Sequence, residues 1–167
     1  NQNNAQTTIL ITMPKFQLNL QIASKENHIP TKVQFKSWAK AALRVDTEVT
    51  IRIVDVDEGR ILNSTYRGKD YATNVLTFPI SEVPHLMGDI IICAPVVGAE
   101  AHAQNKPLEA HYAHLTVHGV LHLRGYDHET EEQAALMESI EVTTLQKLGY
   151  SNPYLITEDN HANENLL

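Results

Sequence analysis

The chain has 167 residues, enough for one domain with a single core, and its 43% of apolar residues is ordinary for a globular protein. No apolar run approaches the roughly 18 residues that a membrane-spanning helix needs, so the sequence predicts no membrane protein. The net charge of −7 comes from residues 129–167, which contain eight acidic residues and one lysine. In the earlier residues the acidic and basic side chains balance. The acidic total therefore does not exclude a local basic surface that binds a polyanion.

The N-terminal third of the chain predicts a strand, a helix and a second strand after a structureless start. Residues 1–8 are polar and lack the apolar segment of a secretory signal, so we expect them to be disordered or added during cloning. Residues 16–22 alternate apolar and polar side chains and predict a strand. A helix follows over 31–44, with Thr31 as its N-cap. The β-branched residues over 48–56 predict the clearest strand of the chain.

Basic residues recur every four positions along the predicted helix at 31–44. The members of this basic ridge are Lys32, Lys36, Lys40 and Arg44. Residues four apart lie on the same face of a helix. We weigh two roles for the ridge, a solvated surface face and a contact with RNA.

The middle of the chain predicts a short helix and two further strands. The helix is expected over 59–63, and a strand over 74–78 is expected to end at Pro79, because proline cannot donate to a strand ladder. A strand over 90–93 begins with three consecutive isoleucines, which predicts burial on both faces and an interior place in the sheet. The only cysteine, Cys93, is expected to be a buried thiol, which fits a reducing cytoplasm.

After Pro95 the apolar spacing becomes helical and predicts three helices. The first ends near Gln104, and the second runs from Pro107 to Leu123. The third covers 129–148, with apolar residues inside and acidic residues facing solvent.

Together these elements predict an α+β fold, in which a small mixed four-stranded sheet is packed by five or six helices. No repeat or linker interrupts residues 9–155, so we expect them to form one domain. The polar residues 156–167 predict a flexible tail. The helix that ends at Leu123 is expected to be central.

The sequence HGVLHLRGYDH at 118–128 has histidines and a glycine at the spacing of a metal site. His118 and His122 lie four residues apart, so one face of a helix presents both rings side by side. Gly125 can adopt the left-handed conformation that ends a helix and reverses the chain, which brings His128 to the same point. The spacing therefore predicts a site of three imidazoles at the end of the central helix.

Three neutral imidazoles favour Zn²⁺, although other divalent transition metals compete for such ligands. Three protein ligands leave one coordination position open, as in catalytic rather than structural zinc sites. A metal ion at such a site activates water for attack on a carbonyl carbon or on phosphorus. We therefore expect a hydrolytic centre with one zinc ion per chain.

Two neighbours of the three histidines each have two possible roles. His114 lies one turn before His118, where it either flanks the cavity or packs as an ordinary histidine. Asp127 either orients a ligand imidazole or caps the helix that follows. Both alternatives stand for each residue.

The motif departs at its second position from zinc proteases that share the histidine spacing. Those proteases carry a glutamate there, which takes a proton from water and passes it to the leaving amine. This chain has Gly119, which cannot serve. Peptide hydrolysis is therefore an alternative that requires Glu109 or Asp127 to reach the ion.

Four segments of the chain closely resemble the bacterial YbeY family of single-domain zinc-dependent endoribonucleases. They are LNSTYRGKDYATNVLTFP at 62–79, GDIIIC at 88–93, HGVLHLRGYDH at 118–128 and LGYSNPY at 148–154. The resemblance covers nearly all residues from 16 to 154. Some members have Asp and Ser where this chain has Asn74 and Thr77, and both exchanges keep a polar side chain.

The resemblance implies zinc bound by His118, His122 and His128, with His118 also counted among the catalytic residues. It implies cleavage of single-stranded RNA, with roles in maturing the 3′ end of small-subunit rRNA and in ribosome quality control. The implied partners are rRNA and the ribosome or its small subunit. The family also places Arg60 in the cleft, where its guanidinium would hold a phosphate or stabilise charge on phosphorus.

Cleavage of RNA is compatible with the absence of this glutamate, because the leaving group is an alkoxide rather than an amine. The attacking group is either water or the adjacent 2′-hydroxyl. We expect Arg60, Arg67 and the basic ridge to steer the strand, so that affinity falls as salt rises. The rival hypothesis is a non-catalytic, ribosome-associated module in which zinc only fastens the chain reversal at Gly125.

Overall fold

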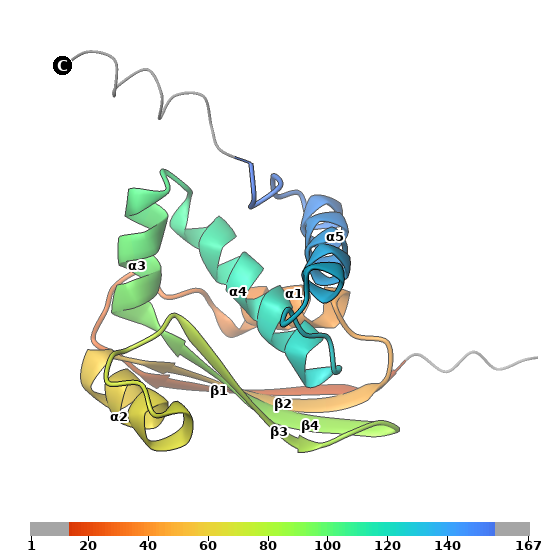
Figure 1. The fold of residues 1–167 in the computed structure, drawn as a ribbon, viewed down its shortest axis with the longest axis horizontal. Helices are drawn as coiled ribbons and strands as arrows, with labels where there is room; N and C mark the ends of the chain where they lie inside the picture. The colour runs from red at the N-terminus through yellow and green to blue at the C-terminus, as the bar shows by residue number, and fades with distance from the viewer. Residues whose placement is uncertain (1–13, 156–167) are drawn as a thin grey trace, which may run out of the picture.

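Four strands form one mixed sheet. In the computed structural model, which describes residues 14–155, the strand order is β1-β2-β4-β3 (Figure 1). β1, β2 and β4 run parallel, and β3 is an antiparallel edge strand paired with β4. The expectations for 1–8 and 156–167 lie outside the described residues. The strands are β1 Phe16–Ala23, β2 Asp46–Val54, β3 Val75–Ser81 and β4 His85–Cys93.

Helices cover both faces of the sheet unequally. The five helices in the described part of the chain are α1 Lys32–Ala41, α2 Val56–Arg67, α3 Ala94–Ala103, α4 Leu108–Leu123 and α5 Glu131–Lys147. α1, α4 and α5 lie on one side of the sheet and α2 on the other (Figure 1). The predicted α+β fold with a mixed four-stranded sheet is confirmed. None of the described helices combines the length and apolar character needed to traverse a bilayer.

Each face of the sheet has its own core. Ile90 and Ile92 belong to the large cluster under α4, whereas Ile91 and Cys93 belong to a small cluster against which Leu62 of α2 packs. Successive side chains of a strand point to opposite faces, which explains this division. β4 is therefore buried on both faces, as its run of isoleucines predicts, and Cys93 is buried as expected.

α4 is the central helix, in contact with α1, α3, α5 and the sheet. Its last residue, Leu123, packs on the sheet at Gly88. A Cβ atom added at position 88 would overlap a methyl group of Leu123 and lie 3.1 Å from the carbonyl oxygen of Phe78. Glycine at this position therefore lets the end of α4 approach the sheet closely.

Two elements extend beyond their predicted ends. The strand expected to stop at Pro79 is β3, which continues to Ser81 with a shift in register after Pro79. An edge strand tolerates proline because one side of it needs no ladder donor, so the predicted end was wrong. The short helix expected over 59–63 is the twelve-residue α2, which Gly68 ends in the left-handed conformation with φ +69°.

The basic ridge is shorter than predicted. α1 ends at Ala41, so Arg44 lies beyond the helix instead of on its last turn. The Arg44 guanidinium donates to the carbonyl oxygens of Ala41 and Leu43, at 3.3 and 2.7 Å. Three lysines of the ridge thus share the helix, and Arg44 closes its end, where a cation is favourable beside the unpaired carbonyls.

Candidate metal centre

Three histidine rings converge at the end of α4. His118 and His122 lie on the last two turns of the helix, and their Nε2 atoms are 3.0 Å apart. Gly125, with φ +96°, follows the end of the helix where the chain reverses and brings in His128. The His128 ring centroid lies 5.6 Å from that of His118 and 5.0 Å from that of His122. One ring nitrogen of each histidine lies within 4.8 Å of the other two.

This arrangement fits a transition-metal ion. Nitrogens that bind one zinc ion tetrahedrally at about 2.0–2.1 Å are about 3.3 Å from one another, so small rotations of the rings would close the site. Burial lowers the pKa of His122, and the charges of His118 and His128 lower it further. A lowered pKa favours the neutral imidazole, which is the form that binds metal. The three-histidine cluster can therefore hold a metal ion.

We expect the metal affinity of this cluster to fall as the pH falls. Each imidazole must be neutral to bind, and an ordinary histidine has a pKa of about 6.5. The lowered pKa of His122 keeps this ring neutral to a lower pH, but protonation of any one ligand opens the site. Between about pH 7.5 and about pH 5.5 the affinity for Zn²⁺ should drop by about tenfold or more, as measured by competition with a chromogenic chelator. A constant affinity across this range would contradict ligation by imidazoles.

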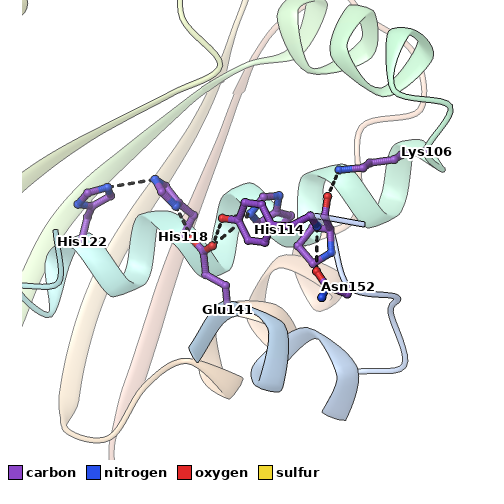
Figure 2. Close-up of polar contacts among 8 residues, drawn as sticks. Lys106, His114, His118, His122, Glu141 and Asn152 are labelled. Carbon is purple, nitrogen blue, oxygen red and sulfur yellow. Dashed lines mark hydrogen bonds and ion pairs between the residues drawn. The ribbon is translucent and has the colours of Figure 1, made fainter. Parts of the chain in front are cut away.

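The buried carboxylate of Glu141 hydrogen-bonds to the ring nitrogen of His118 that does not face His122. Glu141 of α5 has 0% of its surface exposed, and its Oε1 atom accepts a hydrogen bond from Nδ1 of His118 (Figure 2). A carboxylate in this position fixes the tautomer of a ligand imidazole and directs Nε2 toward the metal. His118 is therefore held with Nε2, the nitrogen that is available to a metal ion, facing His122.

The surroundings keep Glu141 ionised. Burial alone would raise the pKa of its carboxyl group, but hydrogen bonds from His114, His118 and Tyr154 lower it to about 2. Burial, and then the hydrogen bond to Glu141, raises the pKa of the Tyr154 hydroxyl, which therefore remains a donor. Glu141 is thus a charged acceptor enclosed by donors.

The sequence prediction missed Glu141, because it placed the acidic residues of this helix on the solvent side. For Glu141 that expectation is wrong. Met137 and Leu145, four residues to either side, are both buried, so Glu141 lies within the apolar stripe of α5. A charged residue in the middle of such a stripe was the signal that could have identified it.

The two neighbours of the cluster occupy different places. His114 Nε2 lies 3.2 Å from the Tyr154 hydroxyl and 3.5 Å from Glu141 Oε2, so it contacts the support of the site. Asp127 lies beside the ligands, and its carboxylate accepts the backbone N–H of His128 at 2.8 Å. The N-cap of α5 is Thr130, whose hydroxyl accepts from the backbone of the first turn.

The three histidine rings line an open groove of about 630 Å³. Tyr66 and Arg67, at the end of α2, line the same groove, as do residues 73–78 of β3 and the turn before it. Of the residues predicted to bind RNA, Arg67 is thus brought together with the histidines. The groove lining does not include the exposed ridge residues Lys32, Lys36, Lys40 and Arg44.

Arg60 lines a separate hollow with Asp57 and Asp70. Its guanidinium donates to the two carboxylate oxygens of Asp70 at 2.7 and 3.0 Å. The Arg60 side chain is 56% exposed, so this ion pair contributes little stability and can open. Arg60 and Arg67 are seven residues apart, which places them on the same face of α2.

Gly119 is packed against the sheet. An added Cβ would lie 3.1 Å from two carbon atoms of Ile90 and 3.4 Å from Cγ2 of Thr77. The position where zinc proteases carry their base is therefore closely filled. Glu109 lies on the first turn of α4, about 13 Å along the helix from His118, and accepts a hydrogen bond from Tyr150 at 2.7 Å.

Known proteins match this chain over most of its length. The family model described as Endoribonuclease YbeY matches residues 17–149. Proteins named Endoribonuclease YbeY from Methylobacillus flagellatus and Paraburkholderia phymatum are 65% and 55% identical to it over 142 and 148 residues. These matches cover 85% and 84% of this chain, and 95% and 97% of the two relatives.

A solved structure also matches this fold. The solution structure of TM1509 from Thermotoga maritima matches with a TM-score of 0.51 at 26% identity, and the match covers 83% of this chain and 99% of that protein. The residues matched by the family model include the three histidines and all of the sheet except Phe16. This chain therefore belongs to the YbeY endoribonuclease family.

Proposed function

We propose that the protein is a zinc-dependent endoribonuclease that cleaves single-stranded RNA. The observation that carries the proposal is the convergence of His118, His122 and His128 on the wall of an open groove that also holds Arg67. The name shared by its relatives, endoribonuclease, gives the reaction class. By family membership we further infer a role in rRNA processing, with the small ribosomal subunit as the partner.

Different residues of the groove can perform different parts of phosphodiester cleavage. A zinc ion held by the three imidazoles would supply Lewis-acid stabilisation of the charge that develops on the phosphoryl oxygens. Arg67 can donate two parallel hydrogen bonds to a phosphate and so hold the strand in the groove. Asp127 and Glu129 line the same groove, and either carboxylate can accept a proton from the attacking hydroxyl.

Arg60 extends this cationic surface in the proposal. It lies two turns before Arg67 on the same face of α2, and its exposed pair with Asp70 can be exchanged for a phosphate. The three lysines of α1 and Arg44 would attract more distant parts of the strand through their charge alone.

Reversing the charge of either arginine should weaken RNA cleavage. Arg67→Glu should lower the cleavage of a single-stranded oligoribonucleotide by about tenfold or more, because a charge-assisted contact contributes about 1.5–3 kcal/mol. Arg60→Glu should act in the same direction, and each change should reduce the slope of log affinity against log salt by about 0.7. Lys147→Glu, an equal charge change at an exposed residue of α5, should alter the rate by less than about twofold. Wild-type cleavage and salt dependence in both arginine variants would exclude this mode of RNA binding.

Peptide hydrolysis is the weaker alternative for this geometry. The position of the protease base is occupied by Gly119, whose surroundings leave little space for a side chain. Of the two other carboxylates considered, Glu109 is on the far turn of α4 and bound to Tyr150. Asp127 lines the groove beside the histidines and is the carboxylate on which this alternative depends. This alternative would gain support if the protein cleaved an unstructured protein substrate and a zinc chelator abolished that cleavage.

A further inference from the structure

The turn that follows α5 is fastened to the start of α4. The Tyr150 hydroxyl donates to Glu109 at 2.7 Å and accepts from the indole N–H of Trp38 at 3.1 Å. Lys106, just before α4, donates to the carbonyl oxygen of Pro153 (Figure 2). The turn is therefore held against the helix that carries the metal ligands, at the end far from them.

One residue of this turn reaches inward. The hydroxyl of Tyr154 donates to Oε2 of Glu141, and it lies 3.2 Å from Nε2 of His114. The Tyr154 ring packs edge-on against the His114 ring, with centroids 5.3 Å apart and an interplanar angle of 82°. Tyr154 as a whole residue is 43% exposed, whereas its hydroxyl is inserted between His114 of α4 and Glu141 of α5.

Both oxygens of Glu141 are thereby occupied. Oε1 accepts from His118, and Oε2 accepts from Tyr154, with His114 at 3.5 Å. Because Glu141 has no exposed surface, water does not replace a lost donor without a rearrangement of the packing. A carboxylate held at both oxygens has one orientation, and that orientation sets the direction of the His118 ring.

We propose that Glu141 and Tyr154 are positioning residues of the metal centre. Tyr154 orients Glu141, Glu141 orients His118, and the turn after α5 is in this way part of the metal-binding apparatus. The proposal concerns metal binding, so its success or failure does not depend on whether the protein cleaves RNA.

Zinc affinity of the full-length chain, measured by competition with a chromogenic chelator, tests this proposal. Glu141→Gln keeps the shape but loses the charge, and should weaken Zn²⁺ binding by about 10- to 100-fold. Tyr154→Phe removes one hydroxyl and should weaken it by about two- to tenfold. Tyr150→Phe is the matched control, because it removes a hydroxyl from the same turn that bonds Trp38 and Glu109 instead of Glu141. It should leave zinc affinity within about twofold of wild type.

Thermal unfolding of the metal-free protein separates positioning from simple stabilisation. Both tyrosine variants should lower the melting temperature, Tyr154→Phe the more, because it takes a donor from a buried carboxylate whereas the Glu109 carboxylate is exposed. Only Tyr154→Phe should lower zinc affinity. The two sites should also be coupled: in a Glu141→Ala background, Tyr154→Phe should cause no further loss of zinc affinity. Equal zinc affinity in the two tyrosine variants, or additive losses in the double variant, would overturn the relay through Glu141.

Discussion

His118→Ala will remove both metal binding and RNA cleavage, and it will also weaken the fold. The variant lacks one of three ligands, and a bound metal contributes several kcal/mol of charge stabilisation, so cleavage should fall by about 10³-fold or more. It also leaves the buried Glu141 carboxylate without its imidazole donor. Removing one hydrogen-bond donor from a buried carboxylate costs about 1–3 kcal/mol of unfolding free energy or more, because the acceptor that loses it is charged. Metal content, oligoribonucleotide cleavage and urea denaturation measure the three effects.

His122→Ala is the control that separates ligation from folding. Its ring centroid lies 4.6 Å from that of His118 and 5.0 Å from that of His128, and its Nε2 is directed to His118 rather than to Glu141. This variant should lose metal and cleavage to the same extent while losing less stability than His118→Ala. Wild-type cutting by both variants would mean that the nuclease activity belongs to a contaminant. If the wild-type protein binds zinc at the three rings but cuts no RNA, with or without ribosomes, the hypothesis of a non-catalytic, ribosome-associated module would be favoured.

Gly119→Glu will not convert the centre into a protease, and it will destabilise the protein. The first side-chain carbon at this position lies 3.1 Å from Ile90, so it crowds the interface of α4 with the sheet. Overpacking costs about 1–3 kcal/mol, and a carboxylate buried without partners adds several kcal/mol. We expect a loss of about 3 kcal/mol or more in unfolding free energy, measured by urea denaturation, with no turnover of an unstructured protein substrate.

Gly98→Glu is the matched control for this substitution. Gly98 also lies inside a helix, α3, but an added Cβ there meets no atom within 4 Å. Glutamate has a better helix propensity than glycine, so the Gly98 variant should be about as stable as the wild type or slightly more stable, by up to about 1 kcal/mol. If the Gly119 variant matched the Gly98 variant in stability and cleaved protein, the packing argument would be wrong.

The parts of the fold predictable from sequence are those that local spacing determines. His118 and His122 share a helix face because of the helical period, and the run of isoleucines in β4 reflects burial on both faces. The end of β3 was mispredicted because the cost of Pro79 depends on which strand is at the edge, and the order of strands is not a local property.

The parts of the site that escaped prediction depend on contacts between distant residues. Glu141 meets His118 across two helices, and spacing within one helix carries no information about the other. The direction of the Arg60 side chain is likewise determined by Asp70, ten residues later in a loop. The resemblance to a family places such residues near a cleft, but their partners come from the tertiary structure.

Because the hydrophobic cores on the two faces of the sheet differ in size, the two walls of the groove are expected to differ in flexibility. His118 and His122 stand on α4, which packs into the large cluster, and His128 follows the end of this helix. By contrast, α2 rests on the small cluster around Ile91 and Cys93. Local opening is easiest where few apolar contacts are lost. The arginine-bearing wall is therefore expected to open more easily than the imidazole-bearing wall. In the proposed function it would adapt to RNA strands of different course, while the imidazole-bearing wall would keep its shape.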